Sequence, residues 1–504
     1  MNNGKICVSV CAETASEFQN KIKSGEEFAD IIELRFDCLN EGEIQKFFEL
    51  PSSKKMELFT FRPKEQGGKR ELSVEDRLKF WSLWQTDNLW VDFEFDLFQT
   101  IIDASYTRRL TICSHHDFNA VPTSLAEIYE KMLETKADVI KIAVRTDDVT
   151  DGLPLIKLLE RAKAENRELI PIAMGESGVW TRILGLSRGA FMTFAALDEE
   201  SATAPGQLTA EEMIDVYRVK ELDETTEIYG LVANSVAYSV SPQMHNEAFK
   251  FHKMNAVYVP FAVKKLEEFM RRMVNTKTRE IDLNFRGFSV TIPHKIEIMK
   301  FLDFVDGTSR KIGAVNTVKI EGDKLLGFNT DADGFIEPLK NTYGDLNGAR
   351  VAVFGAGGAA RACVYALLRE NASVTIFARN TEKAESLAAE FGVQIKELPI
   401  QNSKSETQNF DVIVNATPLG MKKGGLENET PATAEQLKGV GLVYDLVYNP
   451  FETRLMREAS AVSVPTIGGM AMLVAQAAAQ QKIWTGKNAP VEKMSTAALK
   501  KLRS

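Results

Sequence analysis

The sequence has few cysteines and no long apolar run. Five cysteines in 504 residues include no C-x-x-C pair, so we expect five reduced, buried thiols: Cys7, Cys11, Cys38, Cys113 and Cys363. The longest apolar stretch, MAMLVAQAAA from Met470, is far shorter than the roughly 20 residues that span a bilayer. The chain enters a strand-like run, ICVSV, within a few residues of Met1, which is unlike a signal peptide. We therefore expect no membrane association and a cytoplasmic location.

The sequence also lacks an excess of basic residues and any metal-binding motif. Its formal net charge is -9, and the pairs Lys264-Lys265 and Arg271-Arg272 alternate with acids at helical spacing, as on a solvated helix face. A nucleic-acid partner is not expected. His245, His252 and His294 have no metal-ligand spacing, so we expect no metal. No oligomeric state follows from the sequence.

Length and strand pattern indicate an α/β protein of about three domains. Eight β-rich runs alternate with helical stretches in the first 200 or so residues, which predicts a (β/α)8 TIM barrel over residues 1–222. The runs are KICVSV, IIELRFD, ELFTFR, WVDFEFD, LTICSHH, VIKIAV, LIPIAM and AFMTFAAL. We expect an α/β substrate-binding lobe over 226–335, a Rossmann lobe over 336–465, and C-terminal helices over 466–504 that pack back on this second unit.

The loop GAGGAA, residues 355–360, predicts a dinucleotide site. It fits G-x-G-x-x-[GA] directly after the strand-like RVAVF and before a helical stretch. Gly355 permits the tight turn, and Gly357 lets the backbone approach a pyrophosphate at the helix N-terminus. About 20 residues later the chain carries Arg379 and Lys383, basic residues that favour the 2′-phosphate of NADP over the ribose hydroxyl of NAD.

Lys141 is the most informative residue of the first half. It lies among apolar neighbours in VIKIAV, where burial would lower the pKa of its amine and make it a nucleophile for a carbonyl carbon. A lysine that reaches solvent from the strand end, or one paired with an acid, is an equally good interpretation of this residue alone.

Six ordered motifs over residues 5–218 resemble the type I 3-dehydroquinate dehydratases: ELRFD, LFTFRPKEQGG, SHHDF, ADVIKIAV, AMGESGVWTR and TAPGQ. The resemblance implies that Lys141 forms a Schiff base with the substrate ketone and that His116 moves protons, so that water is eliminated and 3-dehydroshikimate forms. The remaining matched positions imply substrate contacts at Ser9, Glu33, Arg35, Arg62, Arg182, Thr203 and Gln207. Arg182 suits the substrate carboxylate, whereas structural ion pairs at the barrel mouth are the alternative for Glu33 and Arg35.

One position departs from this family. A glutamate usually follows the arginine of TFR by four residues and orients the histidine, but this chain has Gln66 there and Glu65 one position earlier. A glutamine cannot balance an imidazolium charge. Our hypothesis is that Gln66 or Glu65 still holds His116, with the histidine pKa less elevated than beside a glutamate.

Residues 228–485 resemble shikimate dehydrogenase through YSVSPQMHN, FSVTIPHK, GAVNT, GFNTDADG, VNATPLGM, YDLVYNP and GGMAMLVAQ. The resemblance implies Lys295 and Asp331 as the catalytic pair, the alternative for Lys295 being a solvated lysine at the start of a helix KIEIMKFLD. It implies substrate contacts at Ser239, Ser241, Thr291, Asn316, Tyr448 and Gln476. It implies cofactor contacts at Gly355, Ala356, Gly357, Gly358, Ala359, Arg379, Lys383, Asn415, Thr417 and Gly469.

The segment before those serines departs from its family. ANSVAYS stands where Gly-Asn-Pro-Val-x-His is common, so Tyr238 changes the local loop. We expect the hydroxyls of Ser239 and Ser241 to face one side of an extended turn, toward a carboxylate.

The two halves resemble consecutive steps of the shikimate pathway. The sequence therefore predicts a bifunctional lyase and NADP-dependent oxidoreductase that converts 3-dehydroquinate to shikimate, with small-molecule substrates as its partners. Two alternatives are a second half that acts on quinate, and a binding or regulatory protein that has lost one of the two chemistries, which Gln66 would favour.

Overall fold

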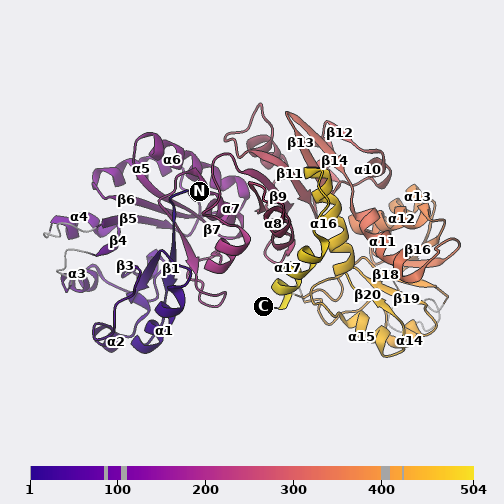
Figure 1. Ribbon diagram of the computed structural model, residues 1–504, viewed down its shortest axis with the longest axis horizontal. Coiled ribbons are helices and arrows are strands. Elements are labelled where there is room, and N and C mark those ends of the chain that lie inside the picture. Colours follow the sequence, from indigo (N-terminus) through magenta and orange to yellow (C-terminus); the bar gives the residue numbers. More distant parts are fainter. Residues whose placement is uncertain (1, 84–88, 104–109, 399–408, 423–424, 504) are drawn as a thin grey trace. The chain divides into compact units, whose positions relative to one another are not determined.

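The computed structural model describes residues 2–83, 89–103, 110–398, 409–422 and 425–503 (Figure 1). The chain forms two compact units. The first comprises Met1–Gly230, Asn234–Tyr238 and Asn255–Phe285, and the second comprises Leu231–Ala233, Ser239–Met254 and Arg286–Ser504.

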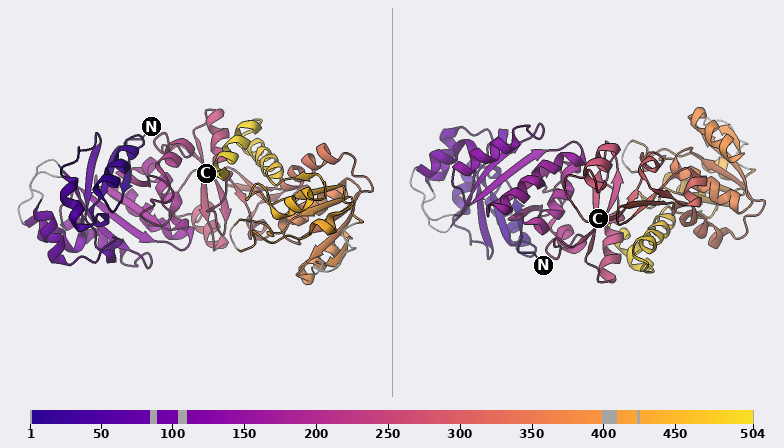
Figure 2. Two further views of the ribbon diagram at one scale, coloured as in Figure 1. Left: turned by 90° about the horizontal axis from the view of Figure 1, so that it is seen from below. Right: turned by 90° about the horizontal axis from the view of Figure 1, so that it is seen from above.

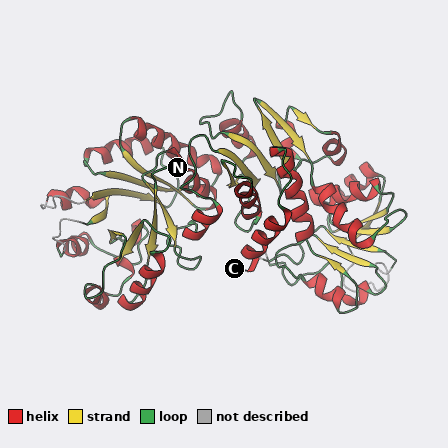
Figure 3. Ribbon diagram, in the orientation of Figure 1, coloured by secondary structure: helices red, strands yellow, loops and turns green. Residues whose placement is uncertain are grey.

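The first eight strands form one parallel sheet with the order β7-β6-β5-β4-β3-β2-β1-β8, which confirms the predicted barrel as a nearly closed one (Figure 3). The strands are β1 (Lys5–Val10), β2 (Ile31–Arg35), β3 (Met56–Thr60), β4 (Trp90–Glu94), β5 (Leu110–Asp117), β6 (Val139–Arg145), β7 (Glu168–Met174) and β8 (Met192–Ala196). Each run predicted from the sequence overlaps one of these strands, and the ends differ by no more than two residues.

Amphipathic helices connect these strands. They are α1 (Ala15–Gly25), α2 (Glu41–Phe47), α3 (Val74–Ser82), α4 (Phe95–Asp103), α5 (Leu125–Glu134), α6 (Leu153–Ala164) and α7 (Val179–Leu184). Local signals set their starts: Ser73 and Asp76 form a capping box at α3, and a proline occupies the first turn of α6. The apolar face of α6 is buried and packs on β7.

The second half begins with a six-stranded sheet of the order β10-β9-β11-β13-β14-β12. Its strands are β9 (Glu227–Ala233), β10 (Ala256–Ala262), β11 (Phe285–Val290), β12 (Phe304–Val305), β13 (Thr317–Glu321) and β14 (Lys324–Phe328). The helices of this part are α8 (Ser241–Phe251), α9 (Leu266–Phe269), α10 (Gly307–Ile312) and α11 (Asp331–Tyr343).

A parallel sheet of the order β17-β16-β15-β18-β19-β20 follows. Numbered from β15, this is the order 3-2-1-4-5-6 of the Rossmann fold, which confirms that prediction. The strands are β15 (Arg350–Phe354), β16 (Ser373–Ala378), β17 (Gln394–Glu397), β18 (Val412–Asn415), β19 (Leu442–Asp445) and β20 (Thr466–Ile467). Its helices are α12 (Gly358–Arg369), α13 (Thr381–Phe391), α14 (Ala434–Leu437) and α15 (Arg454–Ser460).

Two C-terminal helices complete the second unit, α16 (Met470–Thr485) and α17 (Val491–Arg503), drawn in yellow in Figure 2. Helix α16 packs on α11 and α8, and α17 packs on α8. No helix among the described residues is long and apolar enough to cross a membrane.

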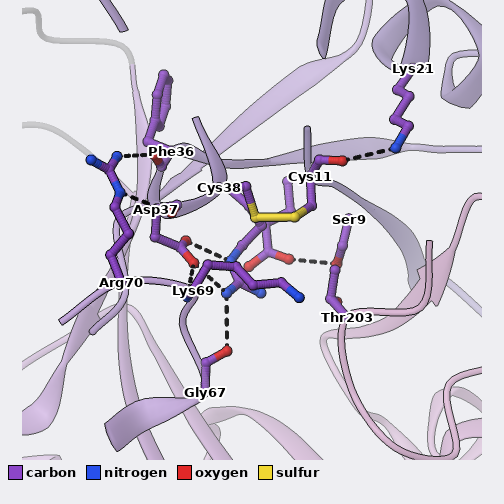
Figure 4. The surroundings of a disulfide bond; sticks show 12 residues. Ser9, Cys11, Lys21, Phe36, Asp37, Cys38, Gly67, Lys69, Arg70 and Thr203 are labelled. Carbon is purple, nitrogen blue, oxygen red and sulfur yellow. Dashed lines mark hydrogen bonds and ion pairs between the residues drawn. A yellow bond between two sulfur atoms is a disulfide. The ribbon is translucent and has the colours of Figure 1, made fainter. Parts of the chain in front are cut away.

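Cys11 and Cys38 form a disulfide, so the prediction of five free thiols is wrong for these two (Figure 4). Cys11 follows β1 directly, and Cys38 ends the short turn η1 (Phe36–Cys38) after β2. Because β1 and β2 are parallel neighbours, their carboxyl ends lie side by side, and the two Cα atoms are 5.4 Å apart. Cys7, Cys113 and Cys363 are free and buried.

The disulfide predicts a measurable loss of stability on reduction. It links cysteines 27 residues apart, and the loss of loop-closure entropy in the unfolded chain stabilises the fold by about 3–4 kcal/mol. We expect dithiothreitol to lower the free energy of unfolding of the barrel, with no effect on a Cys11→Ser/Cys38→Ser variant. Titration of the unfolded, unreduced protein should find three thiols, and five would contradict the bond.

Candidate active sites

The residues that the first resemblance implies lie around one cavity at the carboxyl ends of the barrel strands. The lining includes Ser9, Glu33, Arg35, Arg62, His116, Lys141, Arg182, Thr203 and Gln207.

Strand alternation explains why these side chains point inward. Cys7, Ile31 and Val139 belong to one buried cluster of the barrel. Ser9, Glu33 and Lys141 come two residues later on the same strands and therefore face the same side. The interior is thus apolar deep in the barrel and polar at the carboxyl end.

Lys141 is 3% exposed and does not reach solvent. Its Nζ donates to Asp92 Oδ2 at 2.8 Å and lies 4.0 Å from the centre of the Phe194 ring. Burial lowers the pKa of this amine, although Asp92 opposes the shift. The lysine is therefore both buried and paired with an acid. Its amine loses its proton at a lower pH than the amine of a free lysine does.

Asp92 joins this site and is not among the residues predicted from the sequence. Besides Lys141, it contacts an Arg62 nitrogen at 2.7 Å and accepts a hydrogen bond from Ser114 Oγ at 2.5 Å. Burial acts to raise its pKa, but the charges of Arg62 and Lys141 prevail, and the pKa of Asp92 lies below its usual range. Glu94, two residues on, is also buried, and burial raises its pKa to about 7. The sequence does contain a feature that indicates these two residues: in WVDFEFD, two acids occupy alternate positions of an otherwise apolar strand.

His116 contacts Arg62 and not Gln66. Its Nε2 lies 2.8 Å from an Arg62 terminal nitrogen. Because a guanidinium only donates, Nε2 accepts and Nδ1 carries the ring hydrogen. Burial, followed by the nearby Arg62 and Lys141 charges, holds the pKa of His116 well below its ordinary value. The ring is neutral near pH 7 and able to accept a proton.

The structure does not support the hypothesis that Gln66 or Glu65 holds His116. Gln66 lines the same cavity, but among the described residues its Oε1 and the His116 Nδ1 both lack hydrogen-bond partners. Glu65 is exposed. Gln66 and Glu65 both lie in the turn η2 (Lys64–Gln66), which ends at Gly67 with φ +86°. Arg62, just before this turn, donates the hydrogen bond to His116 Nε2 instead.

The arginines around the cavity differ in what they contact. Arg182 is 2% exposed, and two of its guanidinium nitrogens lack hydrogen-bond partners among the described residues. Burial lowers its pKa to about 10, so it stays charged and open to an anion. Arg35 instead makes a two-pronged pair with Asp37 at 2.9 and 2.8 Å, the structural ion pair that was its alternative.

The remaining polar residues of the cavity hold one another. Glu33 accepts from Ser9 Oγ at 2.5 Å and from Thr60 Oγ1 at 2.9 Å. Gln207 Oε1 accepts from the Thr203 N–H at 2.8 Å, in the loop after β8.

Lys295 and Asp331 meet in the second half. Lys295 Nζ lies 2.6 Å from Asp331 Oδ2, and Asn316 Nδ2 donates to the other oxygen, Oδ1, at 2.8 Å. Asp331 begins α11, whereas Lys295 lies in a turn before the short 3₁₀ helix η8 (Glu297–Phe301). The longer solvated helix that was the alternative for Lys295 is absent from the described chain.

The glycine loop fits a dinucleotide phosphate group. Gly355 has φ +112°, and a Cβ there would lie 2.8 Å from the Ala416 carbonyl oxygen, so a side chain is excluded. The loop follows β15, beside β18, at the point where strand order reverses. A Cβ at Gly358, the first residue of α12, would lie 3.3 Å from Lys295 Cδ. The lysine stem therefore adjoins the loop formed by Gly355, Ala356, Gly357, Gly358 and Ala359.

The other implied cofactor positions surround this loop or lie in its sheet. Asn415 ends β18; its side chain accepts from Thr417 and donates to Asp445, which fixes the following turn. Arg379 is exposed and follows β16 directly. Strand β16 pairs with β15, the strand that leads into the glycine loop. Gly469 precedes α16, and a Cβ there would lie 2.4 Å from the Leu446 carbonyl oxygen. Lys383 is on α13, but its side chain lies outside the described residues.

Ser239 and Ser241 do not form an extended turn. Ser241 is the first residue of α8, and Ser239 Oγ accepts its N–H at 3.2 Å, because a hydroxyl can satisfy a free donor at a helix start. The serines thus mark a helix N-terminus, where a carboxylate is favoured. Thr291 follows β11 directly.

Two implied substrate contacts come from the C-terminal part of the chain. Burial raises the pKa of the Tyr448 hydroxyl. Gln476 on α16 packs against α11: a Cβ added at Gly334 of α11 would lie 2.9 Å from the Cβ of Gln476. No group of three or more metal-ligating side chains occurs among the described residues.

The Arg62 contact predicts how the dehydration step responds to position 66. If His116 is the base, activity falls as pH drops through its pKa, and this limb of kcat/KM, which reports the free protein, lies below pH 6.5. Gln66→Ala should leave the limb in place, since no hydrogen bond joins the two residues. Gln66→Glu adds a carboxylate that stabilises the imidazolium and should move the limb up by about one pH unit. A shift caused by Gln66→Ala would show that Gln66 does hold the ring.

Four family models match consecutive parts of the chain. Residues 6–224 match type I 3-dehydroquinase, and residues 231–318 match the shikimate dehydrogenase substrate binding domain. Residues 337–429 match shikimate / quinate 5-dehydrogenase, and residues 469–499 match the shikimate 5′-dehydrogenase C-terminal domain.

Relatives resemble the whole chain or its second half. The chloroplastic bifunctional 3-dehydroquinate dehydratase/shikimate dehydrogenase of Arabidopsis thaliana is 33% identical over 97% of this chain and 83% of that protein. The shikimate dehydrogenase (NADP⁺) of Methanocaldococcus jannaschii is 40% identical over 56% of this chain and 99% of its own. A crystal structure of a shikimate dehydrogenase with NADP⁺, 40% identical, superposes with a TM-score of 0.51 over 56% of this chain and 97% of that one. The chain therefore belongs to the bifunctional 3-dehydroquinate dehydratase/shikimate dehydrogenase family.

Proposed function

We propose that this chain dehydrates 3-dehydroquinate to 3-dehydroshikimate in the barrel and reduces that product to shikimate with NADPH in the second half. The observation that carries the proposal is the barrel cavity, in which a buried lysine with a lowered pKa faces a space also lined by Arg182, two of whose nitrogens lack a hydrogen-bond partner among the described residues. The bounds of the four predicted domains, the cytoplasmic location and the absence of nucleic-acid and membrane partners stay predictions.

The first reaction uses Lys141 as the nucleophile. Its neutral amine adds to the ketone carbon, and loss of water leaves an iminium that withdraws electrons from the neighbouring carbon. His116 Nε2 then exchanges its hydrogen bond with Arg62 for the substrate, takes the proton from that carbon and returns it to the departing hydroxyl, which leaves as water. Hydrolysis of the iminium releases the enone and restores Lys141. Arg182 is suited to the substrate carboxylate, and Asp92 orients the lysine before attack.

The second reaction needs a proton donor at a ketone oxygen. NADPH, held at the glycine loop, would supply the hydride for reduction. The Lys295 ammonium is placed to stabilise the negative charge that develops on oxygen and to give it a proton, which leaves an alcohol. A proton from solvent then restores the Lys295 ammonium, which Asp331 stabilises through their 2.6 Å contact, and Asn316 fixes the other carboxylate oxygen.

Quinate is a second candidate substrate for the dehydrogenase half, because the model that matches residues 337–429 covers shikimate and quinate enzymes alike. Comparison of kcat/KM for shikimate and quinate, each with NADP⁺ and with NAD⁺, decides between them. Gln66 is the one feature that favours a purely binding or regulatory role, and the presence of Lys141, His116, Lys295 and Asp331 in contacting sets argues against it.

Borohydride tests the Schiff base directly. With 3-dehydroquinate present, reduction should attach the ligand to one lysine, and peptide mass mapping should place it on Lys141. Lys141→Ala should take up no ligand and lose dehydratase activity, while its shikimate oxidation continues, because the second site does not contain Lys141. An adduct on another lysine, or none in the wild-type protein, would refute the proposed chemistry.

Removal of the second ammonium should lower turnover without loss of cofactor binding. We expect Lys295→Met to reduce kcat for shikimate oxidation by about 10²–10⁴-fold, the usual contribution of a positioned proton-transfer group. The Kd for NADP⁺, measured by fluorescence titration, and the dehydratase rate should change less than twofold. Retention of wild-type kcat in Lys295→Met would remove this lysine from the mechanism.

A further inference from the structure

Arg361, in the first turn of α12, makes a contact that neither proposed reaction uses. Helices α10 and α13 both pack on α12 (Figure 1). The Arg361 Nε donates to the Ile312 carbonyl oxygen of α10 at 2.6 Å, and a terminal nitrogen contacts Glu390 of α13. The side chain is 13% exposed, and its guanidinium lies over the ring of Phe391. Arg361 thus joins the helix that follows the glycine loop to a segment outside the Rossmann sheet.

The end of α10 is built to receive this side chain. Ile312 is the last residue of α10, where carbonyl oxygens lack partners within the helix and a cation is favoured. The helix ends at Gly313 with φ +71°, and a Cβ there would lie 2.4 Å from an Arg361 terminal nitrogen. The glycine is therefore required twice, for the left-handed turn and for the close approach of the guanidinium.

The segment that follows Gly313 supports the Lys295–Asp331 pair. The Val315 N–H donates to the Lys295 backbone carbonyl oxygen at 2.8 Å. The next residue, Asn316, donates from Nδ2 to Asp331 Oδ1 at 2.8 Å. The segment therefore holds the backbone of the lysine and one oxygen of its carboxylate partner.

A third contact joins the same segment to the carboxylate. Asn329 Nδ2 donates to the Ala314 carbonyl oxygen at 2.9 Å, and Asn329 Oδ1 accepts the N–H of Asp331 at 3.0 Å. These three residues are buried, and buried polar groups that lose a partner are costly. A displacement of the segment is therefore expected to displace the ion pair with it.

Arg361 lies where this segment and the glycine loop come together. It is three residues after Gly358, where a Cβ would lie 3.3 Å from Lys295 Cδ. Hydride and proton must reach the two atoms of one carbonyl group, so the cofactor and the ammonium need a fixed relation. A misplacement of about 1 Å can cost about 10²-fold in rate. A guanidinium whose planar fork is held by a carbonyl oxygen and a carboxylate is suited to fix such a relation.

We propose that Arg361 is a positioning residue for the dehydrogenase reaction, which holds residues 312–316, and with them the Lys295–Asp331 pair, against the glycine loop. The inference rests on the proposed function in one respect, the assignment of Lys295 as the proton donor. It gives Arg361 no contact with either ligand, so the rate of the bound complex should depend on Arg361 more than the affinity for NADP⁺ does.

The test measures shikimate oxidation in full-length variants. Arg361→Met removes the hydrogen bonds of the guanidinium and should lower kcat about tenfold, as expected for the loss of a hydrogen bond from a charged group. Arg361→Lys keeps a cation and a donor and should lower kcat less. The KM for NADP⁺ and the dehydratase rate should stay within about twofold, because the guanidinium contacts Ile312, Glu390 and Phe391.

Arg369→Met is the matched control. Arg369 ends the same helix and pairs with Asp333 of α11 at 2.8 Å, but the two side chains are 40% and 56% exposed. Exposed pairs of this kind contribute little. The variant should keep the wild-type kcat, and a fall as large as that of Arg361→Met would overturn the proposal, since any contact of α12 would then have the same effect.

A double variant shows whether Arg361 acts through the ion pair. If it does, Lys295→Met/Arg361→Met should have nearly the same kcat as Lys295→Met alone, because coupled residues are not additive. Additive effects would overturn the proposal, and so would a wild-type kcat in Arg361→Met or a rise in the KM for NADP⁺ as large as the fall in kcat. If Arg361→Met does not fold, Arg361→Lys and Gly313→Ala decide by the same criteria. Failure of the wild-type protein to oxidise shikimate would instead refute the proposed function.

Discussion

Each half of the molecule is built around a lysine ammonium held by a buried carboxylate. Lys141 contacts Asp92 at 2.8 Å, and Lys295 contacts Asp331 at 2.6 Å. Burying a charged pair costs desolvation energy, and removal of one partner leaves an uncompensated charge. The surroundings are therefore constrained to satisfy the carboxylate, by Arg62 and Ser114 in the barrel and by Asn316 in the second half.

The two pairs differ in what the surroundings do to the lysine. Lys141 lies fully inside the barrel, and burial lowers its pKa, which suits a nucleophile that must lose its proton. Lys295 is partly exposed beside the glycine loop, where a charged proton donor is needed and water can approach. Net charge offers no help to either site, because the chain carries -9 and the proposed ligands are anions. Attraction must come from local cations such as Arg182.

Sequence patterns predicted the parts of this arrangement that depend on one strand or loop. Alternation located the eight strands, the lone lysine in VIKIAV marked the barrel interior, and GAGGAA marked the Rossmann turn. Contacts between elements were not accessible in this way. The Cys11–Cys38 bond depends on the register of β1 and β2, and Asp92 becomes a partner of Lys141 only when β4 and β6 curve around one cavity. Whether Gln66 or Arg62 meets His116 likewise depends on the turn after β3.

The two proposed chemistries operate in one chain and in sequence, because the barrel releases the ketone that the second half reduces. The most direct test is to add only 3-dehydroquinate to the protein with NADPH and to follow the nicotinamide absorbance. We expect one NADPH to be consumed for each 3-dehydroquinate converted, and 3-dehydroshikimate to accumulate when NADPH is omitted. Lys141→Ala should abolish NADPH consumption from 3-dehydroquinate but not from added 3-dehydroshikimate. No loss of NADPH with either substrate would contradict the account.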